Sequence, residues 1–169
     1  QTPWPNKAVR IVVGFPPGGT TDVMARLISQ GLGEQLGQTF IVENKPGASG
    51  NLAAGEVVKA TPDGYMLLIA PTSVETANPS LFKATFAPSK DLAPVAAIGR
   101  TAMYVVAKPT LDVKDVKDLV AMAKANPGKL SYASAGAGTP PHLAAELFKQ
   151  QAGIFATHIP YRGAAPALQ

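Results

Sequence analysis

The sequence predicts an α/β protein built from two lobes, each containing a parallel sheet. Short runs rich in β-branched residues alternate with stretches of helical periodicity. Glycine-rich loops stand between several of these runs and the helix that follows. This order of strand, loop and helix is typical of parallel sheets covered by helices. One such unit ends near residue 100 and a second begins after it, so we predict lobes over residues 1–100 and 101–169.

The first strand is predicted at residues 8–14, where the run AVRIVVG ends at a glycine. Residues 15–22 form a loop, because two prolines exclude a helix there and two glycines permit unusual backbone angles. An amphipathic helix follows and ends at Gly37. Thr20 or Thr21 is its expected N-cap. The apolar face of this helix consists of Met24, Leu27, Ile28, Gly31, Leu32 and Leu36.

The same pattern then occurs a second time. The expected elements are a strand at 39–42, a glycine-rich loop at 44–51, a short helix at 52–60, a turn at 61–64, and a strand at 65–70 closed by residues 71–73.

The remaining sequence predicts the second lobe. Residues 74–92 are expected to be irregular, because they contain two prolines and no clear period. Further expected elements are strands at 95–98 and 103–107, a helix with Val116, Leu119, Val120 and Ala123 on one face, a strand at 130–134, a glycine loop at 135–142, a helix at 140–151, a strand at 157–160, and a helix that opens at 161–166. Since that last helix has barely begun at residue 169, we expect the chain to be the front part of a longer protein.

The composition excludes several classes of protein. The 169 residues include 16 glycines, 16 prolines and no cysteine, and only 15% of them are charged. Without cysteine there is no disulfide scaffold, thiolate metal site or cysteine nucleophile. No apolar run approaches the roughly 20 residues of a membrane span. The net charge of +4 is scattered, with no two basic residues adjacent, so nucleic acid is not an expected partner.

The glycine-rich loops are candidate anion sites. Each follows a strand and leads into a helix, whose first turn carries unpaired N–H groups and a partial positive charge. Small residues let a carboxylate or phosphate approach this backbone closely. Each loop taken alone is more simply explained as a tight turn with a cap. Two such loops in different lobes favour a ligand site, because they can face each other across a cleft.

Enzymatic alternatives find less support. The glycines around Gly18 do not form G-x-G-x-x-G, and no lysine follows them as a phosphate-binding loop requires, although Glu43 lies where a ribose-binding acid would be. His142 and His158 are more simply explained by capping and packing, and Ser49 does not lie in a G-x-S-x-G motif. We therefore predict no catalytic residue, no metal and no cofactor. A nucleotide-using enzyme and a ligand-sensing regulatory domain remain the alternatives.

Several motifs together resemble one family. They are VVGFPPGGTTD at 12–22, VENKPGASGN at 42–51, PDGY at 62–65, NPSL at 78–81, AKANPG at 123–128, YASAG at 132–136, HLA at 142–144, ELF at 146–148 and PYRGAAPAL at 160–168. In this combination and order the chain resembles the Bug (Bordetella uptake gene) family, the TctC-like periplasmic solute-binding proteins of tripartite tricarboxylate transporters.

The resemblance implies a bilobal, type II periplasmic-binding-protein fold, of which this chain would be an incomplete N-terminal portion. It implies a receptor that closes on a small carboxylate: a di- or tricarboxylate, an acidic amino acid or an aromatic acid. Delivery to membrane transporter subunits, a periplasmic location after removal of a signal peptide, and no catalysis are also implied. Because both lobes would be unfinished, we expect exposed apolar surface and self-association of the isolated chain.

Carried onto this sequence, the resemblance implies ligand-binding loops in both lobes. The expected residues are Phe15, Gly18, Gly19, Thr20, Asp22, Ser49, Thr72 and Ser73 in the first lobe, and Ser134, Ala135, Gly136, Thr139, His142, Tyr161, Arg162 and Gly163 in the second. The first loop departs from the family pattern, with Pro17 and Thr20 where alanine and proline are expected. That difference affects the rigidity of the loop and leaves its backbone donors in place.

Overall fold

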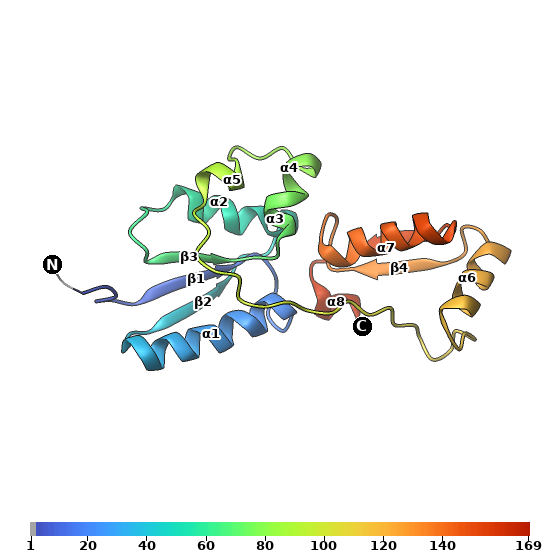
Figure 1. The fold of residues 1–169 in the computed structure, drawn as a ribbon, viewed down its shortest axis with the longest axis horizontal. Coiled ribbons are helices and arrows are strands. Elements are labelled where there is room, and N and C mark those ends of the chain that lie inside the picture. Colours follow the sequence, from blue (N-terminus) through green and yellow to red (C-terminus); the bar gives the residue numbers. More distant parts are fainter. Residues whose placement is uncertain (1–2) are drawn as a thin grey trace.

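The computed structural model describes residues 3–169 and shows two α/β lobes joined by an extended segment (Figure 1). The first lobe contains a three-stranded parallel sheet in the order β2-β1-β3. Its strands are β1 (Val9–Val13), β2 (Phe40–Asn44) and β3 (Met66–Ile69). The register places Val9 beside Phe40 and Arg10 beside Met66, so all three strands end at the same edge. The predicted parallel sheet is therefore present.

The central strand β1 forms the core of the first lobe. Four of its five side chains are at most 1% exposed, which explains why its sequence is an unbroken apolar run apart from Arg10. Helix α1 (Thr20–Leu36) packs on one face of the sheet, and α2 (Asn51–Lys59) contacts the sheet through β3 and β1 (Figure 1). A Cβ atom on Gly14 would lie 2.5 Å from the Gly50 Cα. This contact brings two glycine-containing loops together at the carboxyl end of the sheet.

The region after β3 differs from the sequence prediction. Residues 74–92 were expected to be irregular, but they contain the end of α3 (Ser73–Thr76), then α4 (Asn78–Leu81) and α5 (Pro88–Asp91). In α4 and α5 a proline occupies the first helical turn, where its missing N–H leaves no intrahelical bond unmade. The prolines start these short helices rather than preventing them.

The predicted strands at 95–98 and 103–107 are absent from the structure. Residues 92–115 instead form an extended connection that leads from the first lobe to α6 (Val116–Ala125) (Figure 1). Val95 is 85% exposed and Tyr104 is 83% exposed. The sequence has strand propensity there, but no other strand among residues 3–169 pairs with it, and propensity alone does not form a ladder. The lobe boundary predicted at residue 100 falls inside this connection.

The second lobe has a smaller sheet. Strands β4 (Ser131–Ser134) and β5 (Thr157–Pro160) pair in parallel, with α7 (Pro140–Ala152) as their crossover. The Asp115 side chain caps α6 by accepting the Asp118 amide, and left-handed Gly153 ends α7. The helix predicted to open at 161–166 is the short α8 (Ala164–Ala167). Within residues 3–169, no helix has the length and apolar character needed to cross a bilayer.

Candidate functional site

The buried Asp22 side chain holds the first-lobe loop at residues 15–22. Its carboxylate is 2% exposed and accepts the Gly18 amide at 2.9 Å and the Asn44 Nδ2 at 2.9 Å. Arg26 Nε donates to the same carboxylate at 3.0 Å. Asn44 Nδ2 also donates to the Phe15 carbonyl at 2.9 Å, so both ends of the loop are tied to one polar cluster.

The charge of Asp22 is stabilised by these donors. Burial alone raises the pKa of the Asp22 carboxyl, but hydrogen bonds from Arg26, Gly18 and Asn44 outweigh it and hold the pKa at about 2. Asp22 is therefore ionised at neutral pH, and its oxygens are occupied by protein donors. It lies beneath the loop surface rather than on it.

The start of α1 has no side-chain cap. The N-cap is Gly19, without a side-chain hydrogen bond, so the predicted capping role of Thr20 or Thr21 is wrong. The first intrahelical donor is the Val23 amide, which bonds to the Gly19 carbonyl. The preceding amides of this turn lack intrahelical acceptors, as at every helix start. The N-terminus of α1 therefore offers N–H groups beside the exposed Thr20.

The loop around Ser49 adopts a strained backbone. It contains the 3₁₀ turn η1 (Ala48–Gly50), in which Ala48 and Ser49 have φ angles of 46° and 52°. Asn78 is 1% exposed, and its Nδ2 donates to the Ser49 carbonyl at 3.0 Å and to Asn51 Oδ1 at 2.8 Å. These two bonds hold the turn in place. The Ser49 hydroxyl points to the other lobe and donates to the Ala137 carbonyl at 2.5 Å.

Thr72 and Ser73 lie at the start of α3, at the same edge of the sheet. Thr72 is exposed, and its carbonyl accepts the Thr76 hydroxyl. Ser73 is 2% exposed, and its Oγ has no hydrogen-bond partner within residues 3–169.

The second-lobe loop at 134–139 is held by its own hydroxyl groups. Ser134 Oγ accepts the Gly136 amide at 3.1 Å, and Thr139 Oγ1 donates to the Gly136 carbonyl at 2.6 Å. Both side chains are at most 2% exposed. Thr139 is the N-cap of α7 and Pro140 is in its first turn, as predicted, although the Thr139 hydroxyl bonds to the loop and not to a helix amide. Because Pro140 and Pro141 lack an N–H, this helix start has fewer free donors than α1.

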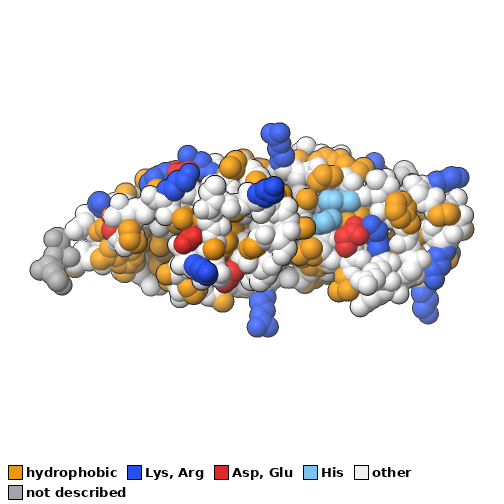
Figure 2. Space-filling view, turned by 90° about the horizontal axis from the view of Figure 1, so that it is seen from above, with side chains coloured by type: hydrophobic (Ala, Val, Ile, Leu, Met, Phe, Trp, Pro, Cys, Tyr) orange, Lys and Arg blue, Asp and Glu red, His pale blue; other side chains and the backbone are white. Residues whose placement is uncertain are grey.

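Both histidines lie against this loop. His142 Nδ1 accepts the Gly138 amide at 3.0 Å, and its ring stacks on His158 with centroids 4.1 Å apart. His158 Nε2 is 2.7 Å from Ser134 Oγ. That distance suits a nucleophile and its base, but the Ser134 hydroxyl is buried and already accepts the Gly136 amide. Figure 2 shows the histidine side chains beside each other at the surface.

Within residues 3–169, the two lobes approach each other at several points. Ser49 contacts Ala137, as described above. A Cβ atom on Gly163 would lie 2.8 Å from Pro16 Cδ, and one on Gly138 would lie 2.6 Å from Leu81 Cδ1. The structure thus brings most of the predicted loops together. Tyr161 and Arg162 are exposed, and Arg162 has no ion pair within the described part of the chain.

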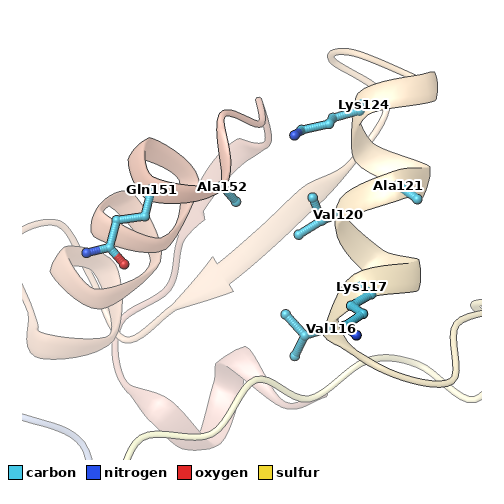
Figure 3. A pocket seen from close by; sticks show the side chains of 7 residues that line it. All are labelled: Val116, Lys117, Val120, Ala121, Lys124, Gln151 and Ala152. Atoms are coloured by element: carbon cyan, nitrogen blue, oxygen red, sulfur yellow. The ribbon is translucent and has the colours of Figure 1, made fainter.

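Two hollows in residues 3–169 bear on the site, one beside the first-lobe loop and one in the second lobe. A small one of about 120 Å³ is next to the start of α1 and is lined by Thr20, Thr21, Met24, Ile69, Ala70, Pro71, Ile98, Gly99 and Thr101. It is below the roughly 300–1,000 Å³ of typical ligand pockets. A larger one, of about 540 Å³, lies between α6 and the end of α7. There Val116, Val120 and Lys124 extend from α6 toward α7 (Figure 3), and no predicted site residue takes part.

Two features bear on the enzymatic alternatives. Arg10 Nε and Nη2 donate to the two carboxylate oxygens of Glu43 at 2.7 and 2.6 Å. This pairing lowers the pKa of Glu43. It also uses the carboxylate oxygens that would accept hydrogen bonds from a ribose. In residues 3–169 there is no group of three or more side chains able to hold a metal ion.

Comparison with known proteins agrees with this architecture. Residues 24–169 match the model of the tripartite tricarboxylate transporter family receptor. The chain belongs to this family. BugT of Bordetella pertussis is 36% identical over 170 residues, and a UPF0065 protein of the same organism is 39% identical over 165 residues. Each alignment covers 98% of this chain and 51% of the relative, so the chain spans about half the length of these curated relatives.

Solved structures of family receptors have the same fold. Rpa4515 of R. palustris, determined with adipate, superimposes with a TM-score of 0.89 at 36% identity. MatC of Rhodopseudomonas palustris, with bound malate, gives 0.84 at 31% identity. These alignments cover 98% of this chain and 56% and 57% of those chains. The periplasmic binding protein BugD gives 0.79 at 32% identity. The predicted periplasmic-binding-protein fold and family are confirmed.

Sequence reasoning missed some of the residues that shape the site. Asn44 and Asn78 fix the two first-lobe loops, yet neither was among the expected site residues. An asparagine at the end of a strand, as at position 44, was the available signal. The buried bond of Asn78 to a turn 29 residues earlier has no local signature. Asp22, expected as a ligand contact, accepts the Gly18 amide in this structure, and its contact with a ligand stays a prediction.

Proposed function

We propose that this chain contributes the carboxylate-binding loops of a periplasmic solute receptor. The observation that carries the proposal is the meeting of loops from two lobes at Ser49 and Ala137. A ligand between these loops would be gripped from both sides, and its binding would be linked to the relative position of the lobes. The family relationship and the relatives with adipate and malate support a dicarboxylate as the ligand.

The first lobe is proposed to supply the stronger anion site. The uncapped N-terminus of α1 directs amides and a partial positive charge outward, and Asp22 and Asn44 fix the loop that precedes it. Gly19 and Thr20 would contact a carboxylate there. The side chains proposed to assist are Phe15, Ser49, Thr72 and Ser73.

The second lobe is proposed to hold the other end of the ligand. Its groups are the backbone of Ala135 and Gly136 and the segment Tyr161–Gly163. Arg162 is exposed and unpaired within residues 3–169, so its guanidinium is free to pair with a second carboxylate. Ser134 and Thr139 are buried, and their hydroxyls shape the loop. We propose that they act through the backbone.

We also propose the cellular role that the family implies. The whole receptor would act in the periplasm, carry its solute to the membrane subunits of a tripartite transporter, and perform no reaction on it. The chain alone would self-associate through the exposed apolar connection at 92–115, where Val106 is 72% exposed. Light scattering of the chain and of a Tyr104→Ser, Val106→Ser variant tests this. A monomeric wild-type chain would contradict it.

Calorimetric titration tests the ligand proposal. Malate, adipate and a neutral diester of adipate are titrated into the wild-type chain and into Thr20→Ala and Arg162→Gln variants. Thr61→Ala, on an exposed turn outside the site, is the matched control. We expect the wild-type chain to bind a diacid and not the diester. Binding of the diacid should be weaker in the two site variants and unchanged in the control. Equal heats from diacid and diester, or no heat from either diacid, would refute the proposal.

A further inference from the structure

Two stacked histidines lie beneath the second-lobe loop and contact it at two places. His142, in the first turn of α7, and His158, on β5, have ring centroids 4.1 Å apart with planes 24° from parallel. His142 reaches the Gly138 amide directly, and His158 reaches the Gly136 amide through the Ser134 hydroxyl. Both imidazoles are thus linked to the backbone that the ligand is proposed to meet.

The contact between His142 and Gly138 requires a neutral ring. Nδ1 accepts the amide hydrogen, so it must carry a lone pair, and the ring proton lies on Nε2. A doubly protonated imidazole has no acceptor and would lose this bond.

His158 is in a similar position. Its Nε2 lies 2.7 Å from Ser134 Oγ, a hydroxyl that is 2% exposed. Burial lowers the pKa of His158, and the neighbouring His142 lowers it further. Its other face stacks on Tyr132, with centroids 4.9 Å apart. The ring therefore favours its neutral form between two aromatic neighbours.

The charged groups around the pair are already matched. Glu146 Oε1 accepts Lys149 Nζ at 2.7 Å and Tyr132 Oη at 2.5 Å. It is 4.0 Å from His142 Nε2, the limit of an ion pair. Lys149 Nζ lies 5.4 Å from the Tyr132 ring centroid. Glu146 favours a His158 cation and Lys149 disfavours it, so the two partly cancel.

The loop needs such support because of its backbone. Gly136 and Gly138 have φ angles of 135° and 76°, which glycine adopts freely and which no side chain of its own restrains. We propose that His142 and His158 are positioning residues of the ligand site, whose neutral rings hold the Gly138 and Gly136 amides and so tie ligand affinity to pH. The inference rests on the proposed function. It assigns neither histidine to direct ligand contact.

Three variants separate positioning from simple packing. Asparagine places an amide oxygen where His142 has Nδ1, and glutamine places an amide group where His158 has Nε2, and neither titrates. His142→Asn therefore keeps the acceptor for the Gly138 amide, His158→Gln keeps a polar group beside Ser134 Oγ, and both remove the protonation. His142→Leu keeps the bulk and removes the acceptor. Thermal unfolding at pH 7.5 checks that each variant is folded.

The first measurement is an NMR titration of the ¹⁵N-labelled chain from pH 8 to pH 5, without ligand. In the wild type, the Gly136 and Gly138 amide signals are expected to move together with the imidazole signals. In the double variant His142→Asn, His158→Gln they should stay constant. If the wild-type amide signals do not change as the imidazoles titrate, the inference is overturned, whatever the malate affinities are.

The second measurement is malate affinity at pH 7.5 and pH 5.5. Because the ligand's own protonation is the same for all proteins at one pH, the ratio of variant to wild-type affinity reports only the effect of the histidines. Loss of one neutral hydrogen bond predicts that the ratio of double-variant to wild-type affinity rises about fivefold on acidification. For the same reason, the His142→Leu protein should bind malate about fivefold more weakly than the wild type at pH 7.5. A constant ratio would overturn the inference. Absence of malate binding at pH 7.5 would count against the proposed function, and the NMR titration would still decide the role of the histidines.

Discussion

The Ser49 hydroxyl donates to the Ala137 carbonyl at 2.5 Å, joining a turn of the first lobe to the glycine loop of the second. Ser49 itself has a left-handed backbone, held by Asn78. A residue with this strain persists only where its surroundings determine it. The bond therefore links a strained turn of the first lobe to the glycine loop of the second, which we propose faces the ligand.

Replacing Ser49 by alanine should loosen the contact between the lobes. The variant loses one hydrogen bond, worth about 1 kcal/mol, and keeps the Asn78 bonds to its backbone. We expect an increased radius of gyration in small-angle scattering and an unchanged circular dichroism spectrum. Ser89→Ala, on exposed α5, is the matched control. Identical scattering curves for Ser49→Ala and wild type would show that the bond does not hold the lobes together.

Asn78→Asp should destabilise the first lobe more than its small change in shape suggests. The amide nitrogen of Asn78 donates to two acceptors, and a carboxylate oxygen in its place would face both without a hydrogen. The expected cost is about 2 kcal/mol in the free energy of urea unfolding. Asn6→Asp, at an exposed position, provides the comparison. Equal unfolding midpoints for the two variants would contradict this account of Asn78.

Asp22 should make the free energy of unfolding depend on pH in the acidic range. Its folded-state pKa of about 2 lies below the ordinary value of 3.8, so the folded protein binds the proton less readily than the unfolded chain. The stabilisation is complete above pH 5, amounts to about 2 kcal/mol, and is lost as the pH falls toward 2. In Asp22→Asn this dependence should disappear, whereas Asp112→Asn, an exposed control, should keep it. Urea unfolding at pH 7, 5 and 3 measures the difference, and parallel curves for all three proteins would refute it.

Gly138→Ala should disturb the lobe contact in addition to straining the backbone. A Cβ atom there would lie 2.6 Å from Leu81 Cδ1, and the residue has a φ of 76°. Gly128 has a similar φ of 82° with nothing within 4 Å. Each alanine variant should lose about 1 kcal/mol from left-handed strain, and only Gly138→Ala should also weaken ligand binding. Equal ligand affinities in the two variants would show that Gly138 lies outside the site.

Local pattern was sufficient for most of the fold. The run at 9–13 was identified because a buried central strand has apolar side chains on both faces, and Gly37 marked the end of α1 because that position needs a left-handed backbone. The expected strands at 95–98 and 103–107 have the right composition. They failed because strand formation requires a partner, and none pairs with them within residues 3–169.

The sequence predicted the loops that meet between the lobes, but not the side-chain bonds that hold them, and their role in ligand binding stays a prediction. Glycines at the ends of strands located both loops, since small residues are needed where backbone approaches backbone. The sequence could not separate side chains that bond to the loops from side chains that are free at the surface, because this depends on burial. Asp22 accepts the Gly18 amide and Asn44 Nδ2, and His142 accepts the Gly138 amide, while contact of either residue with a ligand stays a prediction. Only the folded arrangement gives these pairings.

The central claim is that one dicarboxylate engages loops of both lobes. It is tested most directly by NMR shift mapping of the ¹⁵N-labelled chain titrated with malate at pH 7.5. We expect saturable changes at the amides of Gly19 and Thr20 in the first lobe and of Ala135 and Gly136 in the second, with one common dissociation constant. Changes confined to one lobe, or changes that do not saturate, would contradict the claim.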